Sequence, residues 1–402
     1  MTGEPLYLVV AGVHLGGAGY PNAIRTLQAL RARDGIHIVE CGRWLPETFR
    51  LWSLMQAGIA RRLWTMVLLV VGNLCSAFVA LRQARKLTAP IYLPYPAVPL
   101  LWLFSLLPRR VRPPLVADAY ISLWDSLIVD RGAARTAGKF SRLLRSVEGR
   151  ALRTADIVLT DTQANCDYLI KTFALEPLRV RSLPLAIVEP AGSASIASVR
   201  RDERRPLEVL FVGTLVPLHG IGSLLLGIAP LIHDPSFRFT MIGDGQDAEQ
   251  LERFLQDHPG ANVCWIREWQ EPAQLARSVQ SADVCLGVFG GAGKASRVLP
   301  FKLYLYLAHG RAVVTQEPMS LPAGVPTPPL LTVRPESPEE ITDALRFLRE
   351  NPAAVSNLQH AAVQFYRAHL SNSCVADIWI ALLQEINDRS GKDRPLAGLD
   401  SH

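Results

Sequence analysis

The sequence predicts an α/β protein of two domains, each an open parallel sheet flanked by helices. Short apolar runs alternate with helix-length segments over most of the 402 residues. The alternation is interrupted once, at 189–206 (EPAGSASIASVRRDERRP), and glycines follow the first strand of each half. We therefore expect two Rossmann-like domains at 1–195 and 207–370, facing each other across a crevice. A C-terminal helix at 375–390 is able to pack back on the first domain.

The first half opens with an apolar strand, a glycine-rich turn and a helix (PLYLVVAGVHLGGAGYPNAIRTLQALRA). Gly16 and Gly17 in this turn allow a ligand such as a phosphate to approach backbone N–H groups. The turn does not spell G-x-G-x-x-G, so an NAD-binding protein is disfavoured. The further strands expected in this half are 36–39, 91–93, 115–117, 157–160 and 180–183.

The second half repeats the alternation with buried-type strands. They are expected at 209–212, 237–242, 263–266, 284–288 and 312–315, with helices between them.

The distribution of charge and the spacing of the cysteines indicate the partner and the compartment of the protein. The net charge is +6, but residues 1–115 hold thirteen Lys/Arg against four acidic residues, so the basicity belongs to the first half. These basic residues flank apolar runs, which favours an anionic membrane surface as the partner and not a nucleic acid. The six cysteines form no C-x-x-C, which indicates a reducing compartment. The stretch Leu6–Val13 lacks a cationic start and is interpreted as a strand, not a signal peptide.

The segment Trp64–Leu81 has no charged residue and is bracketed by arginines. Three interpretations are open: a buried helix of the sheet, a helix in the membrane interface, or a membrane span; the first two can hold together, with one face packed and the other touching lipid. The interfacial interpretation is supported by Leu100–Leu107 and by three arginines, which are Arg109, Arg110 and Arg112. A span is disfavoured because it would divide the first domain.

Motifs in 207–316 carry a family resemblance. The order is F-V-G, then P-x-x-G, then G-D-G, then a helix ending in L-A-x-G before a V-V-T strand. This order resembles the GT-B glycosyltransferases, in particular the retaining family 4 group. The first domain matches only in its layout and its glycine loop. Retention of configuration is implied by the resemblance alone.

The residues themselves also indicate a ligand site at the strand ends of the second half. Open α/β sheets bind ligands beyond the carboxyl ends of their strands. Helix N-termini at Gly220 and near Leu299 offer N–H groups to a diphosphate. Lys302 stands in the first turn of a helix, where a cation is unfavourable unless an anion lies nearby. The alternative interpretation is an ordinary exposed surface lysine.

The resemblance implies a nucleotide-diphosphate sugar as donor substrate and no cofactor. Gly213 and Gly220 match the glycines of the phosphate loop, and Lys302 matches the family's basic residue. His219 and Thr214 stand where the family often has lysine and arginine. His219 is interpreted as a phosphate ligand or, alternatively, as a capping or packing residue.

Two further parts of the expected donor site follow from the resemblance and the strand ends. At the positions of the family's E-x7-E glutamates stand Arg297, a potential diphosphate contact, and Leu305, which cannot bind ribose. Gly243 and Asp244 end one strand of the second half, and Arg267 follows the next, near the expected nucleobase.

On the acceptor side, Asp118 follows a short strand and is expected to face the crevice, as a catalytic or orienting carboxylate or as a helix cap. No D-x-D or H-x-x-x-H occurs, so metal independence is expected.

The predicted function is a glycosyltransferase acting on a lipid-linked or saccharide acceptor, peripherally associated with the cytoplasmic face of the membrane. The alternatives are a non-catalytic nucleotide-sugar binder or partner subunit, and a nucleotide-sugar 2-epimerase.

Overall fold

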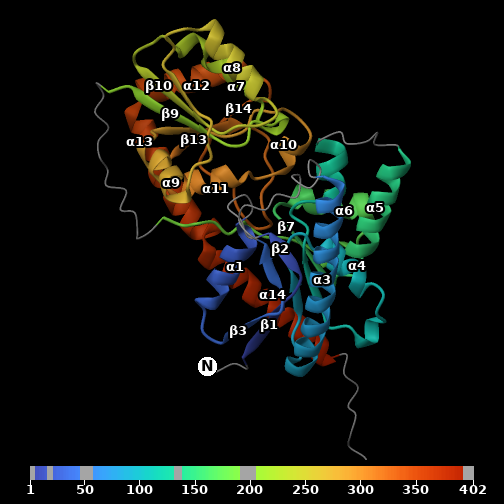
Figure 1. Ribbon diagram of the computed structural model, residues 1–402. Helices are drawn as coiled ribbons and strands as arrows, with labels where there is room; N and C mark the ends of the chain where they lie inside the picture. The colour runs from blue at the N-terminus through green and yellow to red at the C-terminus, as the bar shows by residue number, and fades with distance from the viewer. Residues whose placement is uncertain (1–4, 16–20, 46–57, 131–137, 191–204, 393–402) are drawn as a thin grey trace, which may run out of the picture. The chain divides into compact units, whose positions relative to one another are not determined.

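The computed structural model describes residues 5–15, 21–45, 58–130, 138–190 and 205–392. The chain divides into two compact units (Figure 1). The first unit comprises Met1–Ala186 together with Val375–His402, and the second comprises Ile187–Cys374. Each unit is described by itself below.

The sheet of the first unit has six parallel strands in the order β3-β1-β5-β6-β7-β8. Their bounds are β1 Leu6–Val10, β3 Ile36–Glu40, β5 Ile91–Leu93, β6 Leu115–Asp118, β7 Ile157–Thr160 and β8 Val180–Ser182. A separate parallel pair, β2 (Val13–Leu15) and β4 (Arg43–Leu45), was not predicted, because three residues are too short to show alternation.

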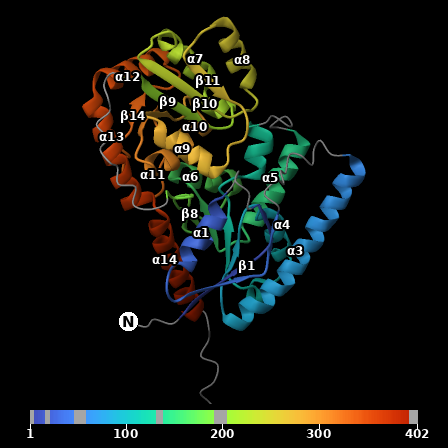
Figure 2. The ribbon, with the colours of Figure 1, turned by 60° about the vertical axis from the view of Figure 1, so that its left-hand side comes forward.

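Helices cover both faces of this sheet (Figure 2). On one face lie α3 (Ile59–Leu87), α4 (Val98–Phe104), α5 (Lys139–Leu152) and α6 (Gln163–Phe173). On the other face lie α1 (Asn22–Arg31) and the C-terminal helix α14 (Asn372–Lys392). Trp379 of α14 is fully buried and meets Tyr92 of β5 edge-on, with ring centroids 4.8 Å apart. The last helix of the chain therefore completes the core of the first unit.

Helix α3 contains the segment Trp64–Leu81 that was expected either to be buried or to meet a membrane. It is not a buried core helix. Only 17% of its most apolar window is buried, and Phe78 is 71% exposed. The buried interpretation is therefore wrong for most of its surface, because only one narrow face of α3 packs on the sheet.

The second unit has a six-stranded parallel sheet in the order β11-β10-β9-β12-β13-β14. Its strands are β9 Leu207–Val212, β10 Phe237–Ile242, β11 Val263–Ile266, β12 Val284–Leu286, β13 Ala312–Gln316 and β14 Leu331–Val333. Strand β14 was not predicted, because its three residues are surrounded by prolines.

Seven helices, counted over 205–374, surround this second sheet. Helices α7 (Ile221–Ile228), α8 (Ala248–Asp257), α12 (Pro338–Glu350) and α13 (Pro352–Phe365) share one apolar core with it. The others are α9 (Pro272–Ser281), α10 (Lys294–Arg297) and α11 (Phe301–Ala308).

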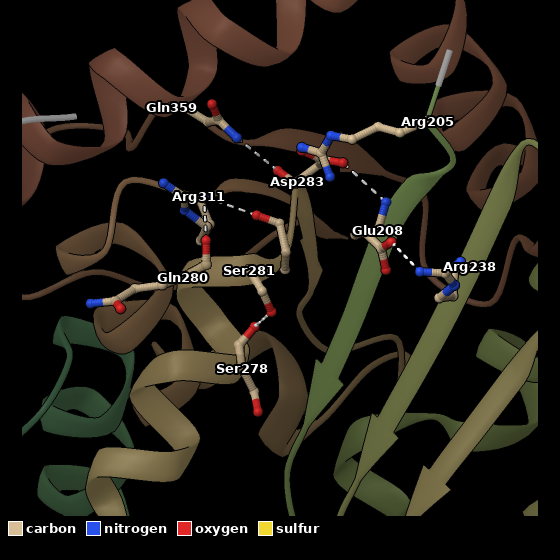
Figure 3. Close-up of polar contacts among 10 residues, drawn as sticks. Arg205, Glu208, Arg238, Ser278, Gln280, Ser281, Asp283, Arg311 and Gln359 are labelled. Atoms are coloured by element: carbon tan, nitrogen blue, oxygen red, sulfur yellow. Dashed lines mark hydrogen bonds and ion pairs between the residues drawn. The ribbon is translucent and has the colours of Figure 1, made fainter. Parts of the chain in front are cut away.

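A polar cluster ties together the edge where the strands of the second sheet begin (Figure 3). The Asp283 carboxylate accepts from the Arg205 guanidinium at 2.6 Å and from the backbone N–H of Glu208 at 3.0 Å. Gln359 donates to the Asp283 carbonyl, and Arg238 pairs with the Glu208 carboxylate at 2.8 Å. The polar side chains at the amino ends of these strands therefore bond to one another. A ligand site is accordingly sought at the carboxyl ends of the strands.

Candidate functional site

The strand order of the second sheet reverses between β9 and β12. The chain runs outward from β9 through β10 to β11, and then returns to place β12 on the other side of β9. Ligands of open α/β sheets bind beyond the carboxyl ends of the strands at such a switch point. The residues that follow these two ends are Gly213 after β9 and Gly287 after β12.

The side chain of Lys302 lies between these two glycines. Pro300 and Phe301 begin α11, and this start directs the second helical residue inward, so that Lys302 is buried. Its Nζ donates to the Gly287 carbonyl at 3.3 Å and lies 3.8 Å from the ring centroid of Phe211. The interpretation of Lys302 as an exposed surface lysine is therefore wrong.

The charge of Lys302 is poorly compensated. Burial lowers the pKa of its ammonium group well below the ordinary value, and among the described residues no carboxylate counteracts the shift. A carbonyl and an aromatic ring stabilise a cation only in part, since a buried charge requires a partner of opposite sign. The surroundings of Lys302 therefore favour the approach of an anion.

His219 lies against the same position. It ends a short 3₁₀ turn (Pro217–His219), and its buried ring contacts Phe211 edge-on at 5.6 Å between centroids. The ring bonds the backbone of Thr214, whereas Nδ1 has no hydrogen-bond partner. Burial and the Lys302 charge lower the His219 pKa well below its ordinary value. One buried nitrogen thus remains available to a ligand.

Two glycines permit this close packing. A Cβ atom on Gly213 would lie 2.8 Å from Cε1 of His219 and 2.9 Å from Nζ of Lys302. Gly220, at φ +63°, precedes α7, and a Cβ there would lie 2.2 Å from the carbonyl carbon of Phe289. Larger residues at these positions would separate the loops, so the structure brings together Gly213, His219, Gly220 and Lys302 of the predicted site.

Three more predicted residues form a group of their own beyond β10 and β11. The Arg267 guanidinium pairs with Asp244 at 3.2 Å and lies 4.8 Å from the ring centroid of Trp265. Trp265 Nε1 in turn donates to the carbonyl of Gly243 at 2.9 Å. Asp244 and Arg267 were predicted separately, and the structure shows them as an ion pair.

The remaining donor-site predictions lie near α11. Arg297 ends the one-turn helix α10 and is partly exposed. Leu305 is buried within α11, and its carbonyl accepts from the His309 ring at 2.8 Å. Thr214 is exposed in the loop after β9. Phe211 was not predicted as a site residue, because in the sequence it is one apolar residue of a strand.

In the first unit, the structure contradicts one of the two interpretations of Asp118, that of a helix cap. It is the last residue of β6 and is buried. Its Oδ2 accepts from the Tyr92 hydroxyl at 2.9 Å, and burial raises its pKa to about 7. Asp118 does not cap a helix: Glu148 does so instead, by accepting from the N–H groups of Leu123 and Trp124 at 2.8 and 2.7 Å. Gly16 and Gly17 lie outside the described residues.

Within the part of the chain that the structure describes, no three His, Cys, Asp or Glu side chains gather as a metal site would require. The six cysteines are free thiols.

A family model described as "Glycosyl transferases group 1" matches residues 206–351, which lie within the second unit. No curated protein sequence matches the chain.

Solved structures similar over nearly the whole chain support the same fold. HepE of Anabaena in complex with UDP has a TM-score of 0.61 at 13% identity, over 94% of this chain and 100% of its own. Sucrose-phosphate synthase of Thermosynechococcus elongatus has a TM-score of 0.65 at 15% identity, covering 96% and 100%. WaaG, a glycosyltransferase involved in lipopolysaccharide biosynthesis, has a TM-score of 0.55 at 14% identity, covering 93% and 99%. The chain therefore has the GT-B fold, and its residues 206–351 match the model of the group 1 glycosyltransferases.

Proposed function

We propose that the protein transfers a sugar from a nucleotide-diphosphate sugar, with the diphosphate bound beyond the carboxyl ends of β9 and β12. The observation that carries this proposal is the buried ammonium group of Lys302, which has no carboxylate partner. It lies beside the unpartnered Nδ1 of His219 and against Gly213. A diphosphate would supply the missing negative charge.

The comparisons support this donor class. The match to the group 1 glycosyltransferases covers every residue of this anion site. HepE, which shares the fold, has also been solved with UDP-glucose. We therefore propose a hexose as the transferred sugar, with Arg267, Asp244 and Gly243 placed beyond the neighbouring strands on the nucleoside side.

The chemistry proposed for this site is electrostatic. As the glycosidic bond to the diphosphate breaks, negative charge grows on the leaving oxygen. A fixed Lys302 ammonium group, aided by Arg297 and by backbone N–H groups at the start of α7, would stabilise that charge without a metal ion. Retention of configuration and a lipid-linked or saccharide acceptor at the cytoplasmic face of the membrane remain part of the proposal.

The test is thermal stabilisation of the purified full chain by UDP, GDP and ADP and by their sugars. A nucleotide at about 100 times its Kd stabilises the folded protein by about 2.7 kcal/mol. We expect one base to give a clear shift that Lys302→Ala abolishes. Arg238→Ala is the matched control, since it removes a cation from the opposite edge of the same sheet. A shift that survives Lys302→Ala would contradict the assignment of this site.

Leu305 favours a second candidate, a non-catalytic binder of nucleotide sugars. A buried leucine stands where the family resemblance places the glutamate that binds ribose. If binding alone has been kept, the protein should bind the nucleotide sugar without hydrolysing or transferring it. Leu305→Glu should then raise the affinity for the nucleoside diphosphate. Transfer of radiolabelled sugar by the unchanged protein to a membrane extract would exclude the binder.

A further inference from the structure

Helix α3 has its polarity reversed relative to a helix on the surface of a water-soluble protein. The side that packs on the sheet carries small and polar residues: Gly72, Asn73, Ser76, Ala80 and Ala84. The outer side carries large apolar residues that are each between 49% and 71% exposed, among them Trp64, Val67, Leu68, Val71, Leu74 and Phe78. The hydrophobic effect in water would favour the opposite arrangement.

The inner side is fixed by specific contacts, so the reversal is not a matter of helix rotation. The Ser76 hydroxyl accepts from the N–H of Gly12 at 2.7 Å, and Asn73 Oδ1 accepts from the N–H of Val13 at 3.4 Å. A Cβ on Gly72 would lie 2.9 Å from a methyl group of Val13. A rotation that buried the apolar side would break these hydrogen bonds and force bulky side chains against β1 and β2.

The apolar surface continues onto neighbouring helices of the same layer. Helix α4 packs against both α3 and α5 (Figure 2). Exposed apolar side chains on and after α4 include Trp102 at 40% and Leu106 at 58%, and those on α5 include Phe140 at 59% and Leu143 at 63%. Exposed large apolar side chains on three helices that pack against one another indicate an apolar partner. We call the exposed side of α3, α4 and α5 the apolar face.

The charge along the sequence of α3 and α4 has one sign. Residues 48–117 contain nine Lys/Arg and no Asp or Glu. Arg82 and Lys86 are exposed at the end of α3, and the Arg85 guanidinium donates to the carbonyl of Val111, beside the exposed Arg110. An apolar surface bordered by cations complements a bilayer with anionic headgroups, because its apolar side chains enter the acyl region while the cations remain at phosphate depth.

We propose that α3 lies in the plane of an anionic lipid bilayer and that the apolar face is the membrane-docking surface of the first unit. The helix contains an 18-residue window with a mean hydropathy of 2.0, so Leu63–Leu87 is long and apolar enough to cross a membrane. Spanning, however, would remove Ser76 and Asn73 from Gly12 and Val13 and place them in hydrocarbon, where unsatisfied polar groups are costly. The in-plane orientation keeps these hydrogen bonds and still removes the apolar side from water.

The first test is flotation of the full chain with vesicles of phosphatidylcholine, with and without phosphatidylglycerol. The triple variant Trp64→Glu, Val71→Glu and Phe78→Glu places carboxylates along one stripe of α3. We expect it to lower the affinity for anionic vesicles by about a hundredfold or more. The matched control carries Leu178→Glu, Leu226→Glu and Phe347→Glu, which are exposed apolar positions on none of the helices α3, α4 and α5, and should bind as the parent does.

A second variant tests the contribution of the cations to membrane binding. Arg82→Gln with Lys86→Gln should lower the affinity for anionic vesicles about tenfold and leave binding to pure phosphatidylcholine unchanged. Arg85 is left in place because it also bonds the chain at Val111. Circular dichroism and the nucleotide-induced thermal shift establish that each variant is folded, and they separate this proposal from the donor site.

The orientation is tested with two natural cysteines that are both exposed, Cys75 on α3 and Cys264 on β11. An environment-sensitive fluorophore on Cys75 should shift to the blue with anionic vesicles, and one on Cys264 should not. Labels at Leu63→Cys and Val79→Cys should report equal depths in an in-plane helix. Unequal depths, with resistance to extraction by high salt, would indicate a span and overturn the proposal. So would absence of vesicle binding, or a dimer that the glutamate stripe dissociates.

Discussion

Nζ of Lys302 lies directly against Gly213, so closely that a Cβ atom on that glycine would lie 2.9 Å from the ammonium nitrogen. The relationship joins two segments 89 positions apart, the end of β9 and the first turn of α11. Because the glycine has no side chain, the Lys302 ammonium group can approach the backbone after β9. A Cβ atom at residue 213 would therefore press on the Lys302 side chain.

Gly213→Ala should therefore impair the anion site more than the fold. The added methyl group would press on both Lys302 and His219, and overpacking of this kind costs about 1–3 kcal/mol. We expect a loss in nucleotide affinity of about tenfold or more, measured by titration calorimetry. Gly260→Ala, also at a positive φ but with open space around it, is the matched control for backbone strain. Equal losses in both variants would show that strain, not contact with Lys302, is responsible.

Lys302→Met should stabilise the nucleotide-free protein while abolishing nucleotide binding. Methionine fills similar volume without a buried charge, and replacing poorly paired buried charges by apolar groups is often neutral or stabilising by about 1–4 kcal/mol. For a unit of this size, each kcal/mol raises the Tm of its calorimetric transition by about 2–4 °C.

The stabilisation by Lys302→Met should depend on pH in one direction. The folded-state pKa of Lys302 is lowered, so the unfolded chain holds a proton that the folded protein releases, and wild-type stability rises with pH across that window. The advantage of Lys302→Met should then shrink as pH rises toward the ordinary lysine range. A variant less stable than wild type at neutral pH would mean that the Phe211 and Gly287 contacts outweigh desolvation.

Nucleotide binding should take up protons. Burial lowers the pKa values of both Lys302 and His219 in the free protein, and a bound diphosphate would raise them again by favouring the charged forms. The complex then holds more protons than its separated components, so affinity should fall as pH rises. Calorimetric titrations in buffers of different ionisation enthalpy measure the uptake directly. Uptake that is reduced but not abolished in His219→Asn would assign the remainder to Lys302, whereas absence of uptake in the wild-type protein would contradict the prediction.

The sheets were predictable from sequence because buried parallel strands are continuous apolar runs. Phe237–Ile242 and Val263–Ile266 were predicted with their observed bounds. Strand β14 was missed because three residues carry no period, and its pairing with β13 is a tertiary contact. The GT-B fold and the group 1 resemblance were predicted correctly, since glycines at strand ends and the L-A-x-G helix are local patterns.

Contacts between residues far apart in the chain could not be predicted from the sequence. Arg267 and Asp244 are 23 positions apart on different loops, and only the register of β10 with β11 brings them into an ion pair. The burial of Lys302 likewise depends on the direction of α11. For α3, the sequence shows the apolar run, but it does not show that Gly72, Asn73 and Ser76 form the face that packs on the sheet.

Asp118→Asn should separate a structural from a catalytic carboxylate. Burial raises the pKa of Asp118 from 3.8 to about 7, so between these values the folded protein holds a proton that the unfolded chain has lost. Wild-type stability contributed by this group is therefore present at low pH and lost as pH rises toward 7. Asparagine keeps an acceptor for the Tyr92 hydroxyl and carries no charge. The Tm of the variant should therefore rise relative to that of the wild type as the pH increases from 4 to 8.

The measurement is calorimetry of both proteins across that range, with the exposed Asp377→Asn as control for the loss of a surface carboxylate paired with Arg33. A Tm difference that does not change with pH would contradict the raised pKa. Sugar transfer gives the second readout, because a general base must accept the proton of the acceptor hydroxyl, which a carboxylate can do and the asparagine amide cannot. Transfer that survives in a stabilised Asp118→Asn protein would assign Asp118 to the core of the first unit, whereas its loss with an unchanged donor Kd would place the carboxylate in the reaction.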